Sequence, residues 1–205
     1  MADPARASDE NLAREAQAGS VRSFEELVTR YEARLYTFLS RACRNEADGA
    51  DLTQETFVTV YTKLHRFNPE QSFETWIFTI ARRKCVDHLR ARKPVAEGEV
   101  PEGLDEDNPS EVAARSEERN DLWARAREIL SEVEFHALWL RYVEELSVEE
   151  TSRVLGRTLS HTKVTLFRAR TKLAENLGAL EHKRPNQGSR GIFEEPRAGS
   201  TQPVR

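Results

Sequence analysis

The 205-residue chain lacks features that mark several protein classes. No stretch approaches the roughly eighteen consecutive apolar residues of a membrane span, so we expect no membrane insertion. The N-terminal MADPARASDE has no apolar segment of the kind found in secretory signals. The two cysteines, Cys43 and Cys85, are too few for a disulfide framework and fit a reducing cytoplasm. Glycine and proline lie mostly outside the periodic segments, which favours helices over a turn-rich β fold.

Signatures of catalysis are missing as well. The five histidines are scattered, and Cys85 and His88 share a helical face without further ligands nearby, so we predict no metal site. The sequence contains no Walker loop, G-x-S-x-G or H-E-x-x-H motif. We therefore expect a protein that is not an enzyme, with no catalytic residue and no cofactor.

Charge is unevenly distributed along the chain. The formal net charge is −4, yet residues 82–93 hold six bases and one acid, and residues 157–172 hold five bases and no acid. Between these two basic segments, residues 96–118 carry nine acids and one base. Two basic segments separated by an acidic tether indicate nucleic-acid binding despite the acidic total.

Apolar periodicity predicts an all-α fold with two small helical domains joined by a flexible acidic linker. In the first half, helices are expected near residues 9–18, from Phe24 to Ala42, from Leu52 to Leu64, and from Phe73 to about Arg92. The predicted organisation is a disordered N-terminus (1–8), a first domain (9–93), the linker (94–114), a second domain (115–182) and a flexible C-terminal tail (183–205).

The second half predicts a helix-turn-helix. Helical periodicity resumes at Leu122 and continues through Tyr142. Ser147 to Glu150 is a capping-box sequence, and the helix that it opens ends at Gly156. Ser160 is then placed to cap a last, basic helix that runs to about Leu177. A helix in this position can lie in the DNA major groove, although an ordinary α-hairpin with a solvated basic face fits the pattern too.

In combination, these segments resemble an extracytoplasmic-function (group IV) RNA polymerase sigma factor. The resemblance rests on residues 24–31, 48–57, 67–90 and 146–173, which follow the family's order. It implies a sigma region 2-like first domain and a helix-turn-helix region 4-like second domain. A sigma factor binds core polymerase, directs it to promoters by recognising minus-35 and minus-10 elements, and promotes DNA opening.

The resemblance also implies a docking strip for the polymerase. In the family, the acidic helix binds the β′ clamp helices, and here the corresponding residues are Asp48, Asp51, Leu52, Gln54, Glu55 and Phe57. The spacing of the acidic and amide residues puts them on one side of a helix. A solvated first turn, where acids favour the helix dipole, is the alternative explanation. Further partners implied by the family are the β flap, promoter DNA and an anti-sigma factor.

The residues for minus-10 DNA lie in a loop and on the helix after it. A base extruded from the duplex needs an apolar face, hydrogen-bond partners and nearby positive charge. The resemblance assigns this role to Arg66, Phe67, Asn68, Gln71, Ser72, Phe73, Arg82, Arg83, Lys84, Asp87 and Arg90. Trp76 is expected in the core rather than as a wedge, because it shares the apolar stripe with Ile80.

The residues for minus-35 DNA lie on the last helix. The expected exposed positions are Ser160, His161, Lys163, Val164, Phe167, Arg168 and Arg170, while Leu166 and Leu173 turn inward. In related sigma factors, the linker enters the polymerase channel that template and RNA later occupy. The alternative role for residues 94–114 is that of a solubilising spacer.

Two other function classes remain open on the residues alone. They are a stand-alone helix-turn-helix regulator and a helical protein-interaction module. The sigma-factor interpretation places the protein in the bacterial cytoplasm, associated with the nucleoid.

Overall fold

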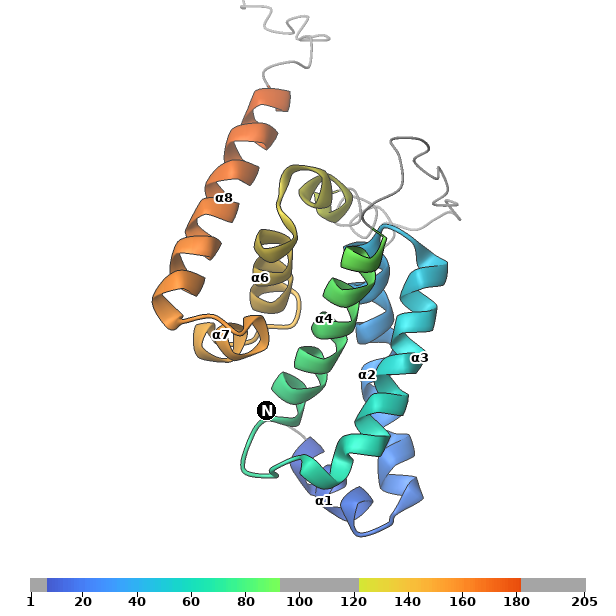
Figure 1. Cartoon of the computed structure of the whole chain (residues 1–205). Coiled ribbons are helices and arrows are strands. Elements are labelled where there is room, and N and C mark those ends of the chain that lie inside the picture. Colours follow the sequence, from blue (N-terminus) through green and yellow to red (C-terminus); the bar gives the residue numbers. More distant parts are fainter. Residues whose placement is uncertain (1–6, 93–121, 182–205) are drawn as a thin grey trace, which may run out of the picture.

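The computed structural model describes residues 7–92 and 122–181, and within these ranges all regular structure is helical (Figure 1). The helices are α1 (Asp9–Gln17), α2 (Val21–Cys43), α3 (Glu46–Lys63), α4 (Phe73–Ala91), α6 (Glu132–Tyr142), α7 (Val148–Leu155) and α8 (Leu159–Glu181). A 3₁₀ turn, η1 (Leu64–Arg66), follows α3, and residues 122–129 form a further helical segment. The all-α prediction is confirmed. The predicted linker, residues 94–114, and the tail, residues 183–205, lie outside the described residues.

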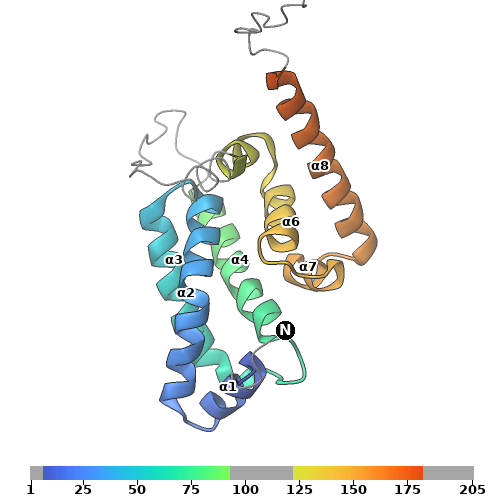
Figure 2. The same ribbon diagram turned by 180° about the vertical axis from the view of Figure 1, so that it is seen from behind.

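The first helices pack around the long α2, which contacts α1, α3, α4 and α6 (Figures 1 and 2). Its apolar stripe is buried as the periodicity predicts, and it includes Leu27, Tyr31, Leu35, Phe38, Leu39 and Ala42. Gly49 lets α3 approach α2 closely. A Cβ at this position would lie 2.0 Å from Ser40 Oγ and 2.7 Å from Ser40 Cα. The glycine in the Asp48–Asp51 segment therefore has a packing role.

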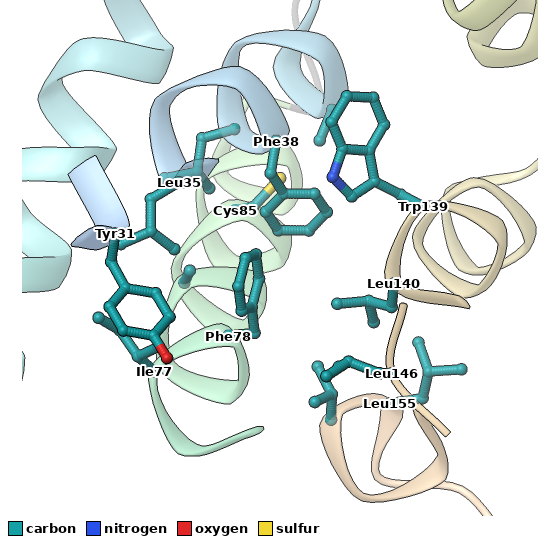
Figure 3. Close-up of a cluster of buried hydrophobic side chains, with 14 of the residues drawn as sticks. Tyr31, Leu35, Phe38, Ile77, Phe78, Cys85, Trp139, Leu140, Leu146 and Leu155 are labelled. Atoms are coloured by element: carbon teal, nitrogen blue, oxygen red, sulfur yellow. The ribbon is translucent and has the colours of Figure 1, made fainter. Parts of the chain in front are cut away.

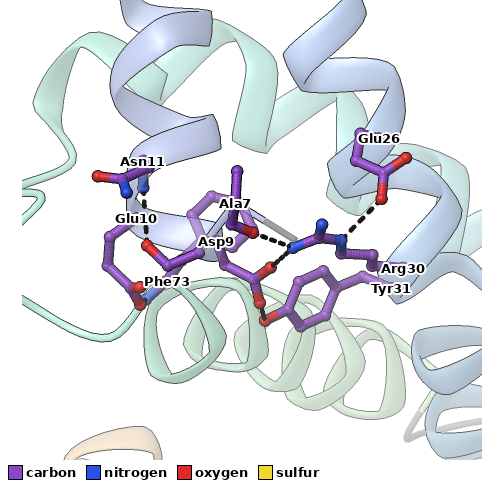
Figure 4. A network of polar contacts seen from close by, with 9 residues as sticks. Ala7, Asp9, Glu10, Asn11, Glu26, Arg30, Tyr31 and Phe73 are labelled. Carbon is purple, nitrogen blue, oxygen red and sulfur yellow. Dashed lines mark hydrogen bonds and ion pairs between the residues drawn. The ribbon is translucent and has the colours of Figure 1, made fainter. Parts of the chain in front are cut away.

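Polar contacts hold the residues around the start of α1 (Figure 4). Ser8 caps α1 by accepting the Asn11 N–H at 3.2 Å. Asp9 accepts hydrogen bonds from Arg30 Nη1 and from the Tyr31 hydroxyl, each at 2.5 Å. Burial and the bond to Asp9 raise the pKa of Tyr31, so this phenol remains a donor. Residues 7 and 8, which the predicted organisation assigns to the segment 1–8, therefore take part in these contacts.

The second domain contains a break that periodicity did not reveal. Residues 122–129 end before Leu130, and α6 starts anew after Ser131. The break is fixed by Glu134, whose carboxylate accepts the Ser131 backbone N–H at 3.0 Å and the Ser131 hydroxyl at 2.8 Å. The apolar periodicity that continues from Leu122 to Tyr142 is therefore divided between two helical segments.

The helix-turn-helix is formed by α7 and α8. Ser147 and Glu150 make the predicted capping box, and Gly156 ends α7 in the left-handed region at φ 63°. The start of α8 differs from the prediction. Thr158, rather than Ser160, accepts a backbone hydrogen bond, from His161 N–H at 3.3 Å, because the helix begins one residue before Ser160.

The two domains pack against each other through one continuous apolar core (Figure 3). The ring of Phe38 on α2 lies 5.3 Å from His136 and 6.2 Å from Trp139, both on α6. Helix α7 covers one side of α4. Figure 3 shows Phe78 of α4 opposite Leu140, Leu146 and Leu155. Within the described ranges, no helix is both long and apolar enough to cross a membrane.

Candidate functional site

The acidic strip on α3 is partly solvent-facing and partly paired with α4. Asp51, Gln54 and Glu55 are exposed, whereas Leu52 is buried beneath them and Phe57 is half-buried. Asp48 pairs with Arg92 at the end of α4. Glu55 accepts a hydrogen bond from Lys84 at 2.9 Å. The strip therefore presents acids and an amide to solvent while its two ends hold α3 against α4.

The loop before α4 exposes polar groups over a buried aromatic cluster. Asn68 forms the turn, accepting the Glu70 N–H on Oδ1 at 3.0 Å, and the side chains of Arg66, Asn68 and Gln71 are exposed. Ser72 caps α4 by accepting the Thr75 N–H at 3.1 Å. The predicted apolar walls differ: Phe67 and Phe73 are buried, with ring centroids 5.4 Å apart.

Trp76 closes this aromatic cluster from the outside. Its ring centroid lies 5.0 Å from that of Phe67 and 5.8 Å from that of Phe73, and it is half-buried. The structure thus supports the expected core role of Trp76. Of the three rings, Trp76 is the one that is partly accessible to solvent, because the two phenylalanines are buried.

The basic residues of α4 lie on different sides of the helix. Arg83, Asp87 and Arg90 are exposed and share one face by their spacing. Arg82 instead is half-buried, its Nε lacks a hydrogen-bond partner among the described residues, and burial lowers its pKa. The largest opposing electrostatic effect on it comes from Glu132, in the second domain. Arg82 is thus half-buried where the domains meet.

The outer face of α8 brings together the residues expected to bind minus-35 DNA. Ser160, His161, Lys163, Val164, Phe167, Arg168 and Arg170 are all exposed. The opposite face buries Thr162, Thr165, Leu166 and Ala169 against the domain core, and Leu173 is half-buried there. Arg170 also donates to the Tyr142 hydroxyl at 3.2 Å. The helix therefore separates a packing face from a basic, solvent-facing surface.

A polar network at the domain contact was not anticipated from the sequence. Arg34 donates from Nε to Glu144 at 2.9 Å and also pairs with Glu74. Trp139 Nε1 donates to the other Glu144 oxygen at 2.8 Å. Burial raises the pKa of Glu144, and the positive charge of Arg34 opposes this shift. No local pattern marks such a pair, because Arg34 and Glu144 are 110 positions apart.

The described residues contain no group of three or more histidine, cysteine, aspartate or glutamate side chains arranged to hold a metal ion. The two surfaces with outward-facing bases are instead a helix-turn-helix and the exposed face of α4. Together they define a two-domain, helical DNA-binding protein.

Comparison with known proteins specifies the family. The Sigma-70 region 2 model matches residues 27–95, and the Sigma-70 region 4 model matches residues 122–173. The chain is 32% identical to RNA polymerase sigma factor YlaC of Bacillus subtilis (strain 168), over 76% of this chain and 92% of that protein. It is 28% identical to the ECF RNA polymerase sigma-E factor of Salmonella typhimurium (strain LT2), over 84% and 96% of the two chains.

A solved structure supports the same assignment. The structure of CnrH in complex with the cytosolic domain of CnrY matches with a TM-score of 0.65 at 28% identity, covering 83% of this chain and 97% of that one. The chain belongs to the extracytoplasmic-function (ECF) family of RNA polymerase sigma factors. It is therefore not an enzyme; it binds core polymerase and promoter DNA and acts in promoter recognition and transcription initiation. The family membership therefore favours the sigma factor over the stand-alone helix-turn-helix regulator and the helical protein-interaction module.

Proposed function

We propose that three exposed surfaces divide the work of this sigma factor. The α3 strip of Asp51, Gln54 and Glu55 docks on the β′ clamp helices, with Leu52 and Phe57 supporting it and Asp48 orienting its start. The exposed acids and amide support this role, because a polar surface on a rigid helix can guide a basic partner into register. The β flap would bind the second domain.

For the minus-10 element, the proposed contacts lie on the loop and on the outer face of α4. Arg66, Asn68 and Gln71 are exposed around the turn, and Arg83, Asp87 and Arg90 continue the surface. Ser72, Phe67 and Phe73 would act by shaping the loop, since a cap and two buried rings hold its geometry. Lys84 and Arg82 would contact DNA only after they leave Glu55 and the domain contact.

For the minus-35 element, we place the reading surface on α8. The observation that carries this proposal is the clean division of α8 into a buried face and an exposed face that holds every predicted contact residue. Residues early in the helix, Ser160, His161, Lys163 and Val164, are placed for base edges. Phe167, Arg168 and Arg170 follow, the two arginines being suited to phosphates.

Transcription in vitro with sigma-free core polymerase tests the α8 assignment. Lys163→Ala is expected to weaken use of a minus-35 element by about 1–3 kcal/mol if Lys163 contacts a base edge, and Arg168→Ala is expected to weaken it through the loss of a phosphate contact. A template that lacks this element should respond to neither change. Arg22→Ala, an exposed arginine on α2, is the matched control. Equal activity of all three variants on the complete promoter would contradict the assignment.

We further propose the domain limits 9–93 and 115–182, with residues 94–114 as a linker that enters the polymerase channel. An acidic segment fits a channel built for phosphates. Exchanging residues 94–114 for a neutral Gly/Ser chain should alter abortive product lengths while leaving promoter choice unchanged. We also propose that the protein is located in the bacterial cytoplasm, associated with the nucleoid, and that an anti-sigma factor controls it. Co-purification with core polymerase and with an inhibitory partner would test both points.

A further inference from the structure

The only two cysteines of the chain lie side by side in the core, on different helices. Cys43 is the last residue of α2 and Cys85 lies in α4, and their Sγ atoms are 3.6 Å apart. Both are free thiols, although 42 residues separate them in sequence. The sigma-factor surfaces described above do not use either thiol. This pair is therefore a chemically reactive group without an assigned role.

The two thiols differ in access and in charge environment. Cys43 is 8% exposed, whereas Cys85 is completely enclosed. The hydrogen bond between the two sulfur atoms lowers the pKa of Cys43, with help from the positive charges of Arg127 and Arg92. The same bond and burial raise the pKa of Cys85. Cys43 is consequently the nucleophile of the pair, and Cys85 remains a protonated neighbour.

A third group, His136, connects the thiols to the second domain. His136 Nε2 on α6 lies 3.9 Å from Cys85 Sγ. Burial lowers the pKa of His136 to about 3, so the ring is neutral. Its Nδ1 has no hydrogen-bond partner among the described residues. The thiol of Cys85 is thus the polar contact that this buried ring makes with the first domain.

We propose that Cys43 and Cys85 form an oxidisable dithiol that a peroxide converts to a disulfide, tying α2 to α4 and withdrawing the Cys85 contact from His136. The Cys43 thiolate attacks one peroxide oxygen, the O–O bond breaks, and the departing hydroxide takes a proton to form water. Cys85 then attacks the Cys43 sulfenic sulfur, the S–S bond forms, and a second water leaves with the Cys85 proton. Two thiols and one hydrogen peroxide give one disulfide and two waters.

The surroundings allow this closure at modest cost. The sulfur atoms must approach by about 1.5 Å to reach the disulfide bond length. Cys43 ends its helix, and Arg44 after it already leaves the helical conformation at φ 55°. Movement of the Cys43 side chain and of the helix end therefore does not disturb a continuous helix.

The consequence falls on the contact between the domains. After oxidation, the Cys85 sulfur is drawn toward Cys43 and away from Nε2 of His136, so the polar contact of His136 with the first domain is lengthened. A buried polar group without a partner destabilises the arrangement that encloses it. Oxidation is therefore expected to loosen α6 from α2 and α4, and reduction to restore the packed form.

Mass spectrometry of the full chain tests the chemistry. The reduced protein is treated with hydrogen peroxide, denatured, alkylated and digested. We expect both thiols to be lost together, with a cross-linked peptide and a monomeric band on a non-reducing gel. In Cys85→Ser, dimedone should trap a Cys43 sulfenic acid, and in Cys43→Ser the remaining thiol should react at least about tenfold more slowly. Two thiols that stay alkylatable, or a disulfide-linked dimer, would overturn the proposal.

Small-angle scattering of the same samples tests the coupling to the domain contact. The oxidised chain should have a larger radius of gyration than the reduced chain, and dithiothreitol should reverse the increase. His136→Phe has no ring nitrogen to leave unpaired, so its radius should respond less to oxidation. An oxidised wild-type chain with an unchanged radius would show that the disulfide does not act on the domain contact.

Discussion

Helices α4 and α8 are both long and basic, yet they present their charges in opposite ways. The bases of α8 that are expected to meet DNA point to solvent while its other face is packed. On α4, Lys84 pairs with Glu55 and Arg82 is half-buried, and Arg92, which follows the last residue of α4, pairs with Asp48. Position in the fold explains the difference: α4 is contacted by α2, α3 and α7, whereas α8 lies at the edge of the molecule and contacts only α6 and α7 extensively (Figure 1).

This comparison indicates that the packed arrangement leaves the two proposed promoter-binding surfaces unequally available. The proposed minus-35 surface on α8 is already exposed. The proposed minus-10 surface offers Arg83, Asp87 and Arg90 at once but keeps Arg82 between the domains. Net charge alone would not distinguish the two helices, because neighbouring acids and burial decide which bases can meet a phosphate.

The largest expected contrast is in stability, between two phenylalanines of these helices. Phe78 on α4 is 0% exposed, and Phe167 on α8 is 63% exposed. Phe78→Ala should lower the free energy of unfolding by about 3–5 kcal/mol, because it leaves a cavity in the shared core. Phe167→Ala should change it by less than about 0.5 kcal/mol. Urea titrations followed by circular dichroism give both values, and similar losses for both variants would contradict the assigned burial.

The next contrast lies within α4 and concerns promoter opening. Arg83→Ala should weaken minus-10 recognition by about 1–3 kcal/mol, because it removes an exposed arginine that we propose to contact a base. Arg82→Met removes a half-buried, poorly partnered charge while keeping apolar volume, so its thermal stability should not fall. Permanganate footprints of polymerase–promoter complexes report opening, and melting curves report stability.

If Arg82→Met impaired promoter opening in the footprints more than Arg83→Ala did, the comparison would be contradicted. Arg82 would then reach DNA in the working complex, which requires α7 to move away from α4. Arg14→Ala, an exposed arginine on α1, serves as the matched control for both measurements.

Much of the fold follows from local sequence signals, as the caps show. Ser147 with Glu150 and the left-handed Gly156 were predictable because each acts within one helical turn. The Ser131–Glu134 box is an equally readable signal, but continuous apolar periodicity obscured it. Local signals do not fix the first residue of α8, because Thr158, which caps it, and Ser160, which the sequence predicts as its cap, are both acceptable cap residues two positions apart.

The site is less predictable where distant segments meet. The enclosure of Phe67 and Phe73 depends on their packing against Trp76 and Tyr31. The proximity of Cys43 and Cys85, and of Arg34 and Glu144, follows from how helices pack rather than from spacing in sequence. By contrast, the exposure of the α8 residues was predictable, because helical periodicity alone separates its two faces.

A smaller effect is expected from the exposed acids of the α3 strip. Replacing Asp51 and Glu55 by lysine should weaken binding of core polymerase by about tenfold while leaving helical content unchanged, because both acids are exposed. The change also frees Lys84 from its bond to Glu55. Glu25 and Glu32, exposed acids on α2, provide the matched double reversal. Fluorescence titration with sigma-free core measures the affinity, and a value within twofold of wild type would show that the strip does not dock.

The smallest effect concerns the cap that positions the helix-turn-helix. Hydrogen bonds from the Ser147 hydroxyl and backbone N–H hold the pKa of Glu150 below its ordinary value of 4.5. A carboxyl whose pKa is lowered by folding contributes stability above its unfolded pKa and loses that contribution as pH falls through the lower, folded pKa. Wild type should therefore lose stability below about pH 4.5 more steeply than Glu150→Gln, which keeps an acceptor but not the charge.

At pH 7, this substitution should cost at most about 1 kcal/mol, because the cap is exposed to solvent. Glu149→Gln alters a neighbouring exposed acid that makes no capping-box bond, and it controls for the general loss of one charge. Urea titrations from pH 3 to pH 7 compare the three chains. If the pH dependence of Glu150→Gln follows that of wild type and of Glu149→Gln throughout, the charge on Glu150 does not stabilise the start of α7. The orientation of α8 would then rest on its buried face alone, through Leu166 and Ala169, and not on the cap of the helix before it.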